Sequence, residues 1–247
     1  MNKDFVGVKM EEKIEQFIKW VKESNNIVFF GGAGVSTESG IPDFRSKDGL
    51  YNQKYDYPPE EILSHTFFMN NTEEFYKFYH DKLNCLEYEP NITHIKLAEL
   101  EKQGKLKAVV TQNIDGLHQK AGSKAVYELH GSVLRNYCMK CHKFYDGEYI
   151  FSHDGVPKCE CGGVIKPDVV LYEEGLDENV ISGSISAMAN ADMLIVAGTS
   201  LTVQPASGLI RFYRGSKLVL INRDATSYDN YANLVINDSL GNVFSKI

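Results

Sequence analysis

The sequence lacks several features that would assign its class at once. No apolar run in its 247 residues approaches the roughly 18–20 needed to cross a bilayer. No Lys- or Arg-rich run occurs, and the formal net charge is −7, which does not favour the backbone of a nucleic acid as partner. Residues 1–12 are polar and lack the apolar core of a signal peptide. We therefore expect a cytoplasmic protein that binds neither membrane nor nucleic acid.

Cysteine is also scarce, and four of the five fall in one window: Cys138, Cys141, Cys159 and Cys161. In a reducing cytosol such a cluster favours a metal site over a disulfide framework. Four thiolates satisfy a closed tetrahedral zinc site and leave no position for water, so the zinc would be structural. Free thiols or a redox pair are the alternatives. We expect the fifth cysteine, Cys85, to be a small buried side chain in a helical stretch.

The rest of the composition is that of an ordinary globular protein, with 43% hydrophobic and 24% charged residues. Apolar residues recur at helical spacing between Met10 and Glu23, and a second helix is predicted at 92–103, ended by Gly104 as a C-cap. Short apolar runs predict four strands, at 27–30, 106–111, 191–197 and 217–221. The length allows one large domain, or one domain with a smaller one inserted.

A polar run follows the strand at 106–111, where residues 109–118 read VVTQNIDGLH. In an open parallel sheet the loops at the carboxyl ends of the strands face the ligand crevice. Gln112, Asn113 and Asp115 offer amide donors, carbonyl acceptors and one carboxylate, which suits a ligand with hydroxyls and a carboxamide. The same residues could also form only a polar turn.

A glycine-rich loop, residues 31–37, follows the first strand. Its glycines let backbone amides approach a phosphate at a helix start. No third glycine stands where the dehydrogenase fingerprint requires it, so we expect pyrophosphate contact without hydride transfer. In the next segment, 40–45, Arg45 suits recognition of a phosphate or carboxylate, and Phe44 can screen a reactive carbon from water.

Four motifs, residues 32–36, 40–45 and 111–118 and the cysteine window, together resemble the sirtuin family of NAD-dependent protein deacylases. The resemblance runs from about residue 27 to about residue 240. It implies an α/β fold, a Rossmann-like parallel sheet domain with a smaller inserted zinc-binding and helical domain, in one catalytic unit over 1–247. The large domain would comprise approximately 1–45, 87–132 and 166–247. The small domain would comprise 46–86, a loop and helical module, and 133–165, the zinc module.

The resemblance also implies an activity: NAD-dependent removal of acetyl groups from protein lysine side chains, giving nicotinamide, O-acetyl-ADP-ribose and free lysine. His130 resembles the catalytic histidine of the family, and its near-neutral pKa suits a general base. Asn113 would order water near the reacting carbon, and Asp115 would hold the carboxamide with the Ile114 backbone. The cofactor contacts implied are Ala33, Thr37, Phe44, Arg45, Gln112, Ile114, Asp115, His130, Thr199, Ser200, Asn222 and Leu240.

Residues 166–174 resemble the sirtuin segment that pairs with the substrate peptide as an added strand, here through Val169, Val170 and Tyr172. The family usually has Phe-Gly-Glu where this chain has Tyr-Glu-Glu at 172–174. Sirtuins that prefer succinyl or malonyl groups share a Tyr-x-x-Arg pair, and Tyr79 and Lys82 stand in that place. Lys82 could be only a solvated helix residue. In either case we expect acetyl to be preferred over succinyl.

Two other classes of function remain open at this point. A mono-ADP-ribosyltransferase would use the same NAD site but pass ADP-ribose to a protein. A non-catalytic module that senses NAD would have no use for the base His130 or for residues 113–115. The sequence does not specify an oligomeric state.

Overall fold

The computed structural model describes residues 3–43 and 57–247, so the predictions for Phe44 and Arg45 lie outside the described residues. The α-helices are α1 (Lys3–Glu23), α2 (Pro59–Ile62), α3 (His65–Asn70), α4 (Thr72–Lys82), α5 (Ile92–Lys102), α6 (Leu117–Lys120), α7 (Gly147–Phe151), α8 (Glu178–Asn190) and α9 (Leu240–Phe244). The strands are β1 (Ile27–Gly31), β2 (Leu106–Thr111), β3 (Val126–Glu128), β4 (Gly131–Cys138), β5 (Phe144–Asp146), β6 (Ile165–Val169), β7 (Met193–Ala197), β8 (Leu218–Ile221) and β9 (Leu234–Ile236). Short 3-10 turns are η1 (Ala33–Val35), η2 (Thr37–Ser39), η4 (Ala206–Phe212) and η5 (Asp229–Tyr231).

The larger sheet contains six parallel strands in the order β3-β2-β1-β7-β8-β9. Strands β1, β2, β7 and β8 end at the same height in the sheet, because Gly31 pairs with both Thr111 and Ala197, and Ala197 pairs with Ile221. The loops after β1, β2, β7 and β8 therefore leave the sheet at one edge. The polar run after β2 lies at this edge, as predicted, beside the glycine loop after β1.

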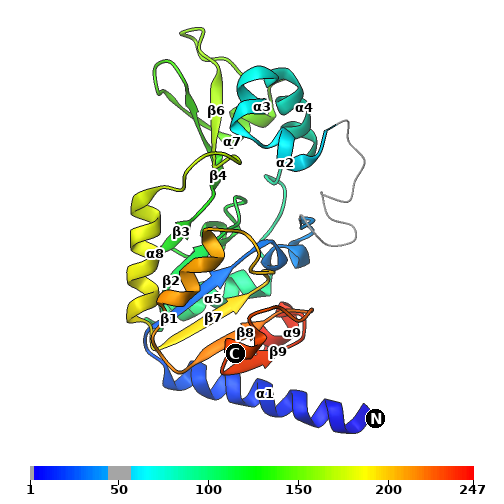
Figure 1. Cartoon of the computed structure of the whole chain (residues 1–247), viewed down its shortest axis with the longest axis vertical. Helices are drawn as coiled ribbons and strands as arrows, with labels where there is room; N and C mark the ends of the chain where they lie inside the picture. Colours follow the sequence, from blue (N-terminus) through cyan, green and yellow to red (C-terminus); the bar gives the residue numbers. More distant parts are fainter. Residues whose placement is uncertain (1–2, 44–56) are drawn as a thin grey trace.

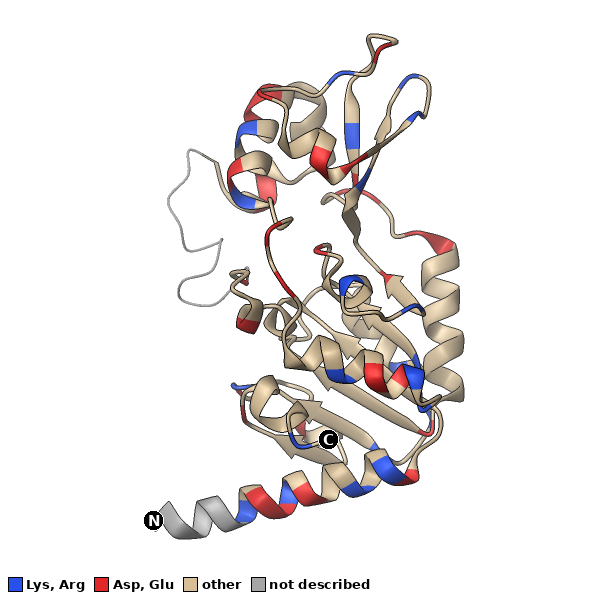
Figure 2. Cartoon of the chain, turned by 180° about the vertical axis from the view of Figure 1, so that it is seen from behind, with Lys and Arg blue, Asp and Glu red and all other residues tan. Residues whose placement is uncertain are grey.

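Helices cover both faces of this sheet (Figures 1 and 2). Along β1, Ile27 and Phe29 pack into a core shared with α1, α5 and α9, whereas Val28 and Phe30 pack into one shared with α8 and η4. The four strand residues are fully buried, as expected for parallel strands covered on both faces. This arrangement confirms the predicted parallel α/β architecture.

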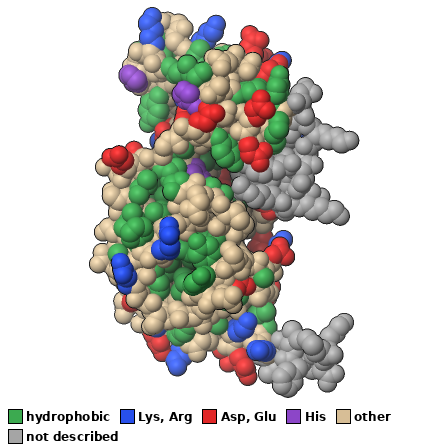
Figure 3. All heavy atoms as spheres, viewed as in Figure 1, with side chains coloured by type: hydrophobic (Ala, Val, Ile, Leu, Met, Phe, Trp, Pro, Cys, Tyr) green, Lys and Arg blue, Asp and Glu red, His purple; other side chains and the backbone are tan. Residues whose placement is uncertain are grey.

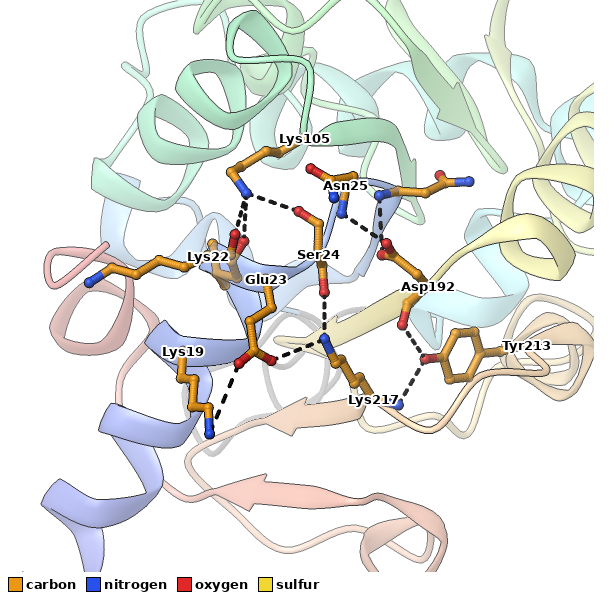
Figure 4. A network of polar contacts seen from close by, with 11 residues as sticks. Lys19, Lys22, Glu23, Ser24, Asn25, Lys105, Asp192, Tyr213 and Lys217 are labelled. Carbon is orange, nitrogen blue, oxygen red and sulfur yellow. Dashed lines mark hydrogen bonds and ion pairs between the residues drawn. The ribbon is translucent and has the colours of Figure 1, made fainter.

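The carboxyl end of α1 is fastened to the amino edge of the sheet by the network in Figure 4. Three carbonyl oxygens at this end, those of Val21, Lys22 and Ser24, each accept a hydrogen bond from Lys105 Nζ, at 3.2, 2.7 and 3.0 Å. A cation there satisfies carbonyls that have no partner within the helix. This network therefore lies at the edge of the sheet opposite the loops that follow β1, β2, β7 and β8.

A second, smaller unit is built on an antiparallel sheet in the order β5-β4-β6, with α2, α3, α4 and α7 beside it. It has its own core, in which Phe68, Phe75 and Tyr76 make edge-to-face contacts. The Tyr76 hydroxyl donates to the Ile165 carbonyl and so joins α4 to β6. This insert confirms the predicted fold class. The division at residues 46–86 and 133–165 remains a proposal, which the separate core supports.

The local prediction for Cys85 was wrong in part. Cys85 is buried, as expected, but it follows the end of α4 and is not helical. None of the described helices is long and apolar enough to cross a membrane.

Candidate active site and metal centre

A cavity of about 1100 Å³ lies between the carboxyl edge of the parallel sheet and the smaller unit. In Figure 3 the surface is hollowed between these two parts of the molecule. Every predicted cofactor, catalytic or peptide residue that the structure describes lines this cavity: Ala33, Thr37, Gln112, Asn113, Ile114, Asp115, His130, Val169, Val170, Tyr172, Thr199, Ser200, Asn222 and Leu240. The fold thus brings together residues that lie as far apart in the sequence as Ala33 and Leu240.

The glycine loop after β1 forms one wall of the cavity. It makes two short 3-10 turns, η1 and η2, where we had predicted the start of a helix. The Gly34 amide donates to the Gly198 carbonyl at 2.8 Å, and a Cβ on Gly34 would lie 2.8 Å from the Gly198 Cα. The loops after β1 and β7 therefore touch backbone to backbone, which explains why glycine is required at this point.

Asp115 is the centre of a buried polar cluster. Its Oδ2 accepts a 2.6 Å hydrogen bond from the Ser36 hydroxyl, and its Oδ1 accepts a 2.9 Å bond from the Leu117 amide. The Asn113 side-chain Nδ2 donates to Ser36 Oγ at 3.0 Å. Burial raises the pKa of Asp115, and the bonds from Ser36 and Leu117 oppose that rise by stabilising the carboxylate. The cluster fixes both predicted catalytic side chains of this loop.

His130 also lines the cavity and follows two residues after the end of β3. Its Nδ1 is 3.0 Å from the Gln112 carbonyl oxygen, which can only accept, so Nδ1 carries the proton. The neutral ring therefore keeps its lone pair on Nε2. Burial lowers the pKa of His130, and the bond to the Gln112 carbonyl partly offsets this. The ring is thus held in the tautomer and charge state of a base at neutral pH.

The glycine after His130 has a steric cause. Gly131 has a φ of 73°, and a Cβ there would stand 1.7 Å from the Asp168 carbonyl oxygen. No other residue fits, because β4 and β6 meet at this point. The His-Gly pair therefore holds the ring at the junction of the two sheets.

A chain of polar contacts continues from Gln112 to the loops after β7 and β8. Gln112 Nε2 donates to Thr199 Oγ1, and the Thr199 amide donates to Asn222 Oδ1, both at 3.0 Å. Asn222 Nδ2 is buried and has no hydrogen-bond partner among the described residues, although Asn222 lines the cavity. A buried amide nitrogen without a partner is costly, so it fits an oxygen-rich ligand such as a ribose. With the glycine loop, this donor fits the NAD site predicted from sequence.

The predicted peptide-binding segment also lines the cavity. Tyr172 already pairs with the start of α3, through its amide to the Leu63 carbonyl and its carbonyl to the His65 amide, at 2.9 and 3.0 Å. Glu173, where the family usually has glycine, has a φ of 75°, and its carboxylate accepts from the Thr66 amide at 2.9 Å. The left-handed backbone is therefore kept without glycine, and the substituted side chain gains a helix-terminal contact.

Four cysteines converge at the far end of the smaller unit, and their Sγ atoms all lie within 4.8 Å of one another. The Sγ atoms of Cys138 and Cys161 are 3.5 Å apart, as are those of Cys141 and Cys159. A zinc–thiolate tetrahedron with bonds of about 2.3 Å has sulfurs about 3.8 Å apart. The amides of Lys140 and Cys161 point at the sulfurs of Cys138 and Cys159. The donor set fits a closed structural zinc site, as predicted.

Sequence reasoning missed several residues that the structure places behind the site. Ser36 was part of a motif without a role, yet it bridges Asp115 and Asn113. His94 had no motif around it, although it is fully buried with its ring 4.7 Å from that of His118. Asn91 donates a hydrogen bond to the Val35 carbonyl of the glycine loop from 56 residues away. Only the polar character of these residues could have marked them.

Comparison with known proteins gives concordant findings. A family model described as the Sir2 family matches residues 32–205, more than half of the chain. Proteins of Clostridium acetobutylicum and Clostridium perfringens, each described as an NAD-dependent protein deacetylase, are 61% identical over 240 and 242 residues. These matches cover 96% of this chain in both cases, and 98% and 99% of the relatives.

Solved structures are similar over nearly the whole chain. One from a study of the mechanism and regulation of Sir2 enzymes has a TM-score of 0.87 at 40% identity and covers 96% of each chain. A Sir2–p53 peptide–NAD⁺ complex has a TM-score of 0.82 at 39% identity, covering 94% of this chain and 96% of that one. A structure of Sir2 bound to acetylated peptide has the same TM-score at 37% identity and the same coverage.

Proposed function

This chain belongs to the Sir2 family and is an NAD-dependent protein deacetylase, and from that premise we propose how its residues divide the work. The substrate is an acetyl-lysine side chain of a protein or peptide. NAD is the co-substrate and is consumed, so that the products are nicotinamide, O-acetyl-ADP-ribose and free lysine. Acetylated peptide is bound by a Sir2 protein of similar structure, which supports this substrate class.

The observation that carries the proposal is the position of two groups in one cavity. His130 presents an unprotonated Nε2, because its Nδ1 proton is held by the Gln112 carbonyl. The Ser36–Asp115–Asn113 cluster lies in the same cavity and carries the carboxylate. A base and a carboxamide-binding carboxylate suit a reaction in which nicotinamide leaves and a ribose hydroxyl is deprotonated.

Each residue then has a separate task. Asp115 and the Ile114 backbone hold the carboxamide of nicotinamide, and Asn113 orders water near the reacting carbon. Gln112 and Asn222 bind ribose hydroxyls, while Ala33, Thr37, Thr199, Ser200 and Leu240 enclose the rest of the dinucleotide. His130 takes a proton from the ribose hydroxyl that receives the acetyl group. Phe44 and Arg45 complete the cofactor contacts in this proposal.

The peptide would lie along Val169, Val170 and Tyr172. Both main-chain groups of Tyr172 are already paired with the start of α3, and the Val170 amide is paired with the His130 carbonyl, so these groups are not open to added-strand pairing. The zinc bound by Cys138, Cys141, Cys159 and Cys161 supplies folding energy to the smaller unit and takes no part in the chemistry.

The test is to incubate the protein with NAD and an acetyl-lysine peptide, and to follow nicotinamide and deacetylated peptide together. We expect the two products to appear in equal amounts. NAD labelled in its ADP-ribose part separates the alternatives: label on protein would indicate an ADP-ribosyltransferase, and label on a released acetylated product a deacetylase. NAD binding without nicotinamide release would contradict the proposal and indicate a sensor.

A further inference from the structure

Asn91 lies outside the cavity, immediately before α5, yet its side chain reaches the loop that forms one cavity wall. Its Nδ2 donates to the Val35 carbonyl at 2.8 Å and to Ser39 Oγ at 3.0 Å. Its Oδ1 accepts from the Thr93 amide at 3.0 Å and caps α5. One side chain therefore combines an ordinary N-cap with two bonds to a distant loop.

The contacts of Asn91 with Val35 and Ser39 lie on either side of residues that line or support the cavity. Val35 ends η1 and Ser39 ends η2, so the residues held between these contacts are 36–38. Ser36 in this interval bonds Asp115, and Thr37 lines the cavity. Single 3-10 turns of this kind have poor hydrogen-bond geometry of their own. The loop conformation therefore depends on contacts from outside, and Asn91 supplies two of them.

The segment that carries Asn91 is itself fixed to the other catalytic loop. Lys120 Nζ donates to the Tyr88 carbonyl at 2.8 Å. The Asn91 backbone N–H donates to His94 Nδ1 at 3.3 Å. The His94 ring in turn packs edge-on to the ring of His118. Both Lys120 and His118 belong to α6, which begins two residues after Asp115. Asn91 thus joins the loop after β1 to the segment that packs against α6, in addition to the direct bonds of Ser36 with Asp115 and Asn113.

We propose that Asn91 is a positioning residue that holds residues 33–39, the two 3-10 turns after β1, in their NAD-binding conformation. It touches neither substrate and acts through Val35 and Ser39 on the placement of Ser36 and Thr37. This inference rests on the proposed function, because it requires NAD to bind against this loop. Without the two donors the loop populates its binding-competent conformation less, and apparent NAD affinity falls in proportion.

Two variants separate the loop contacts from helix capping. Asn91→Ser and Asn91→Asp both keep an oxygen that can cap α5, and both lose the Nδ2 donors. We expect NAD to bind roughly five- to tenfold more weakly by calorimetry. The KM for NAD should rise by the same factor, while the KM for acetyl-lysine peptide at saturating NAD should stay at the wild-type value.

The matched control is Asp177→Ala, which removes an N-cap that accepts from the Asn179 and Val180 amides at the start of α8, away from the loop. We expect a lower melting temperature and unchanged NAD affinity for this variant. Unchanged NAD affinity in both Asn91 variants, or equal weakening in Asp177→Ala, would overturn the inference. Wild-type protein that binds no NAD would instead overturn the proposed function, so the two failures are distinct.

Discussion

The Ser36 hydroxyl donates a 2.6 Å hydrogen bond to the Asp115 carboxylate, although the two residues are 79 positions apart in the sequence. Both side chains are buried, Ser36 with 1% and Asp115 with 9% of its surface exposed. A buried carboxylate is stable only where donors replace water. The loop after β1 therefore maintains the charge of a residue that belongs to the loop after β2.

Replacing Ser36 by alanine should remove one of the donors to Asp115. The pKa of Asp115 should then rise further, because the bond from Ser36 stabilises its ionised form. We expect nicotinamide release to slow by about tenfold at neutral pH, and more at acid pH. The control is a double-mutant cycle with Asp115→Asn. If Ser36 acts through Asp115, Ser36→Ala will have little further effect in that background, and fully additive losses would contradict this.

His130→Ala should abolish deacetylation and leave NAD binding largely intact, because a positioned base contributes about 10²–10⁴-fold to rate. The wild-type kcat/KM should rise with pH through the pKa of His130 and then level off. Since burial lowers that pKa, the midpoint should lie below the ordinary histidine value of about 6.5. Wild-type turnover in His130→Ala, or an acid limb centred above that value, would contradict the assignment.

Those parts of the fold that depend on local patterns could be predicted from sequence. The sequence predicts the strand at 106–111 with its observed ends, because a strand buried on both faces is a continuous apolar run. It also predicts the helix at 92–103 with its terminating Gly104, because the left-handed backbone at that position favours glycine. The polar loop at 112–115 followed from the position of that strand. Long-range contacts left no such signal.

The contacts of Asn91 show why the rest could not be predicted. Asparagine before a helix indicates an N-cap, and that is all a single sequence reveals. That its side-chain amide reaches the Val35 carbonyl and the Ser39 hydroxyl depends on how β1, α5 and the turns η1 and η2 pack together. The same holds for His94 and His118, whose pairing is set by the packing of α5 against α6.

Zinc should be present at one ion per chain and should be structural. We expect Cys138→Ala, or treatment with a strong chelator, to lower the melting temperature and loosen the smaller unit, because metal-binding energy there is also folding energy. Elemental analysis of freshly purified protein checks the stoichiometry. The matched control is Cys85→Ala, which removes the cysteine outside the cluster and should leave zinc content unchanged. Metal-free protein of full stability would refute this prediction.

Acid should destabilise the protein through its buried histidines. Burial lowers the pKa of His94 to about 4, and that of His118 well below its ordinary value. Both are neutral in the folded state and take up protons in the unfolded state as pH falls below about 6.5. The stability they contribute is therefore present near neutrality and is lost between about pH 6.5 and pH 4. Asp115 opposes this loss of stability, because its raised pKa means that it takes up a proton more readily in the folded state than in the unfolded state.

From pH 7 to pH 5 we expect His94 alone to lower the free energy of unfolding by about 2 kcal/mol. Urea unfolding at the two pH values measures this loss. His94→Asn keeps an acceptor for the Asn91 amide but cannot titrate, so its stability should change less with pH. Equal slopes for the wild type and His94→Asn would contradict the prediction.

The last prediction concerns acyl choice. Tyr79 is fully buried, stacked between Phe75 and Phe151, and the cavity is lined instead by Lys82. The Lys82 ammonium lies 2.8 Å from the Asp81 carboxylate, so a succinyl carboxylate would compete with Asp81 for it. Lysine also lacks the two parallel N–H donors with which arginine binds a carboxylate.

We therefore expect kcat/KM to be higher for acetyl-lysine than for succinyl-lysine in matched peptides. Asp81→Asn should narrow that difference, because it removes the carboxylate that would compete with succinyl for Lys82, and Lys82→Arg should narrow it further. A wild-type preference for succinyl would show that Lys82 binds the carboxylate despite Asp81, and the prediction would then be wrong.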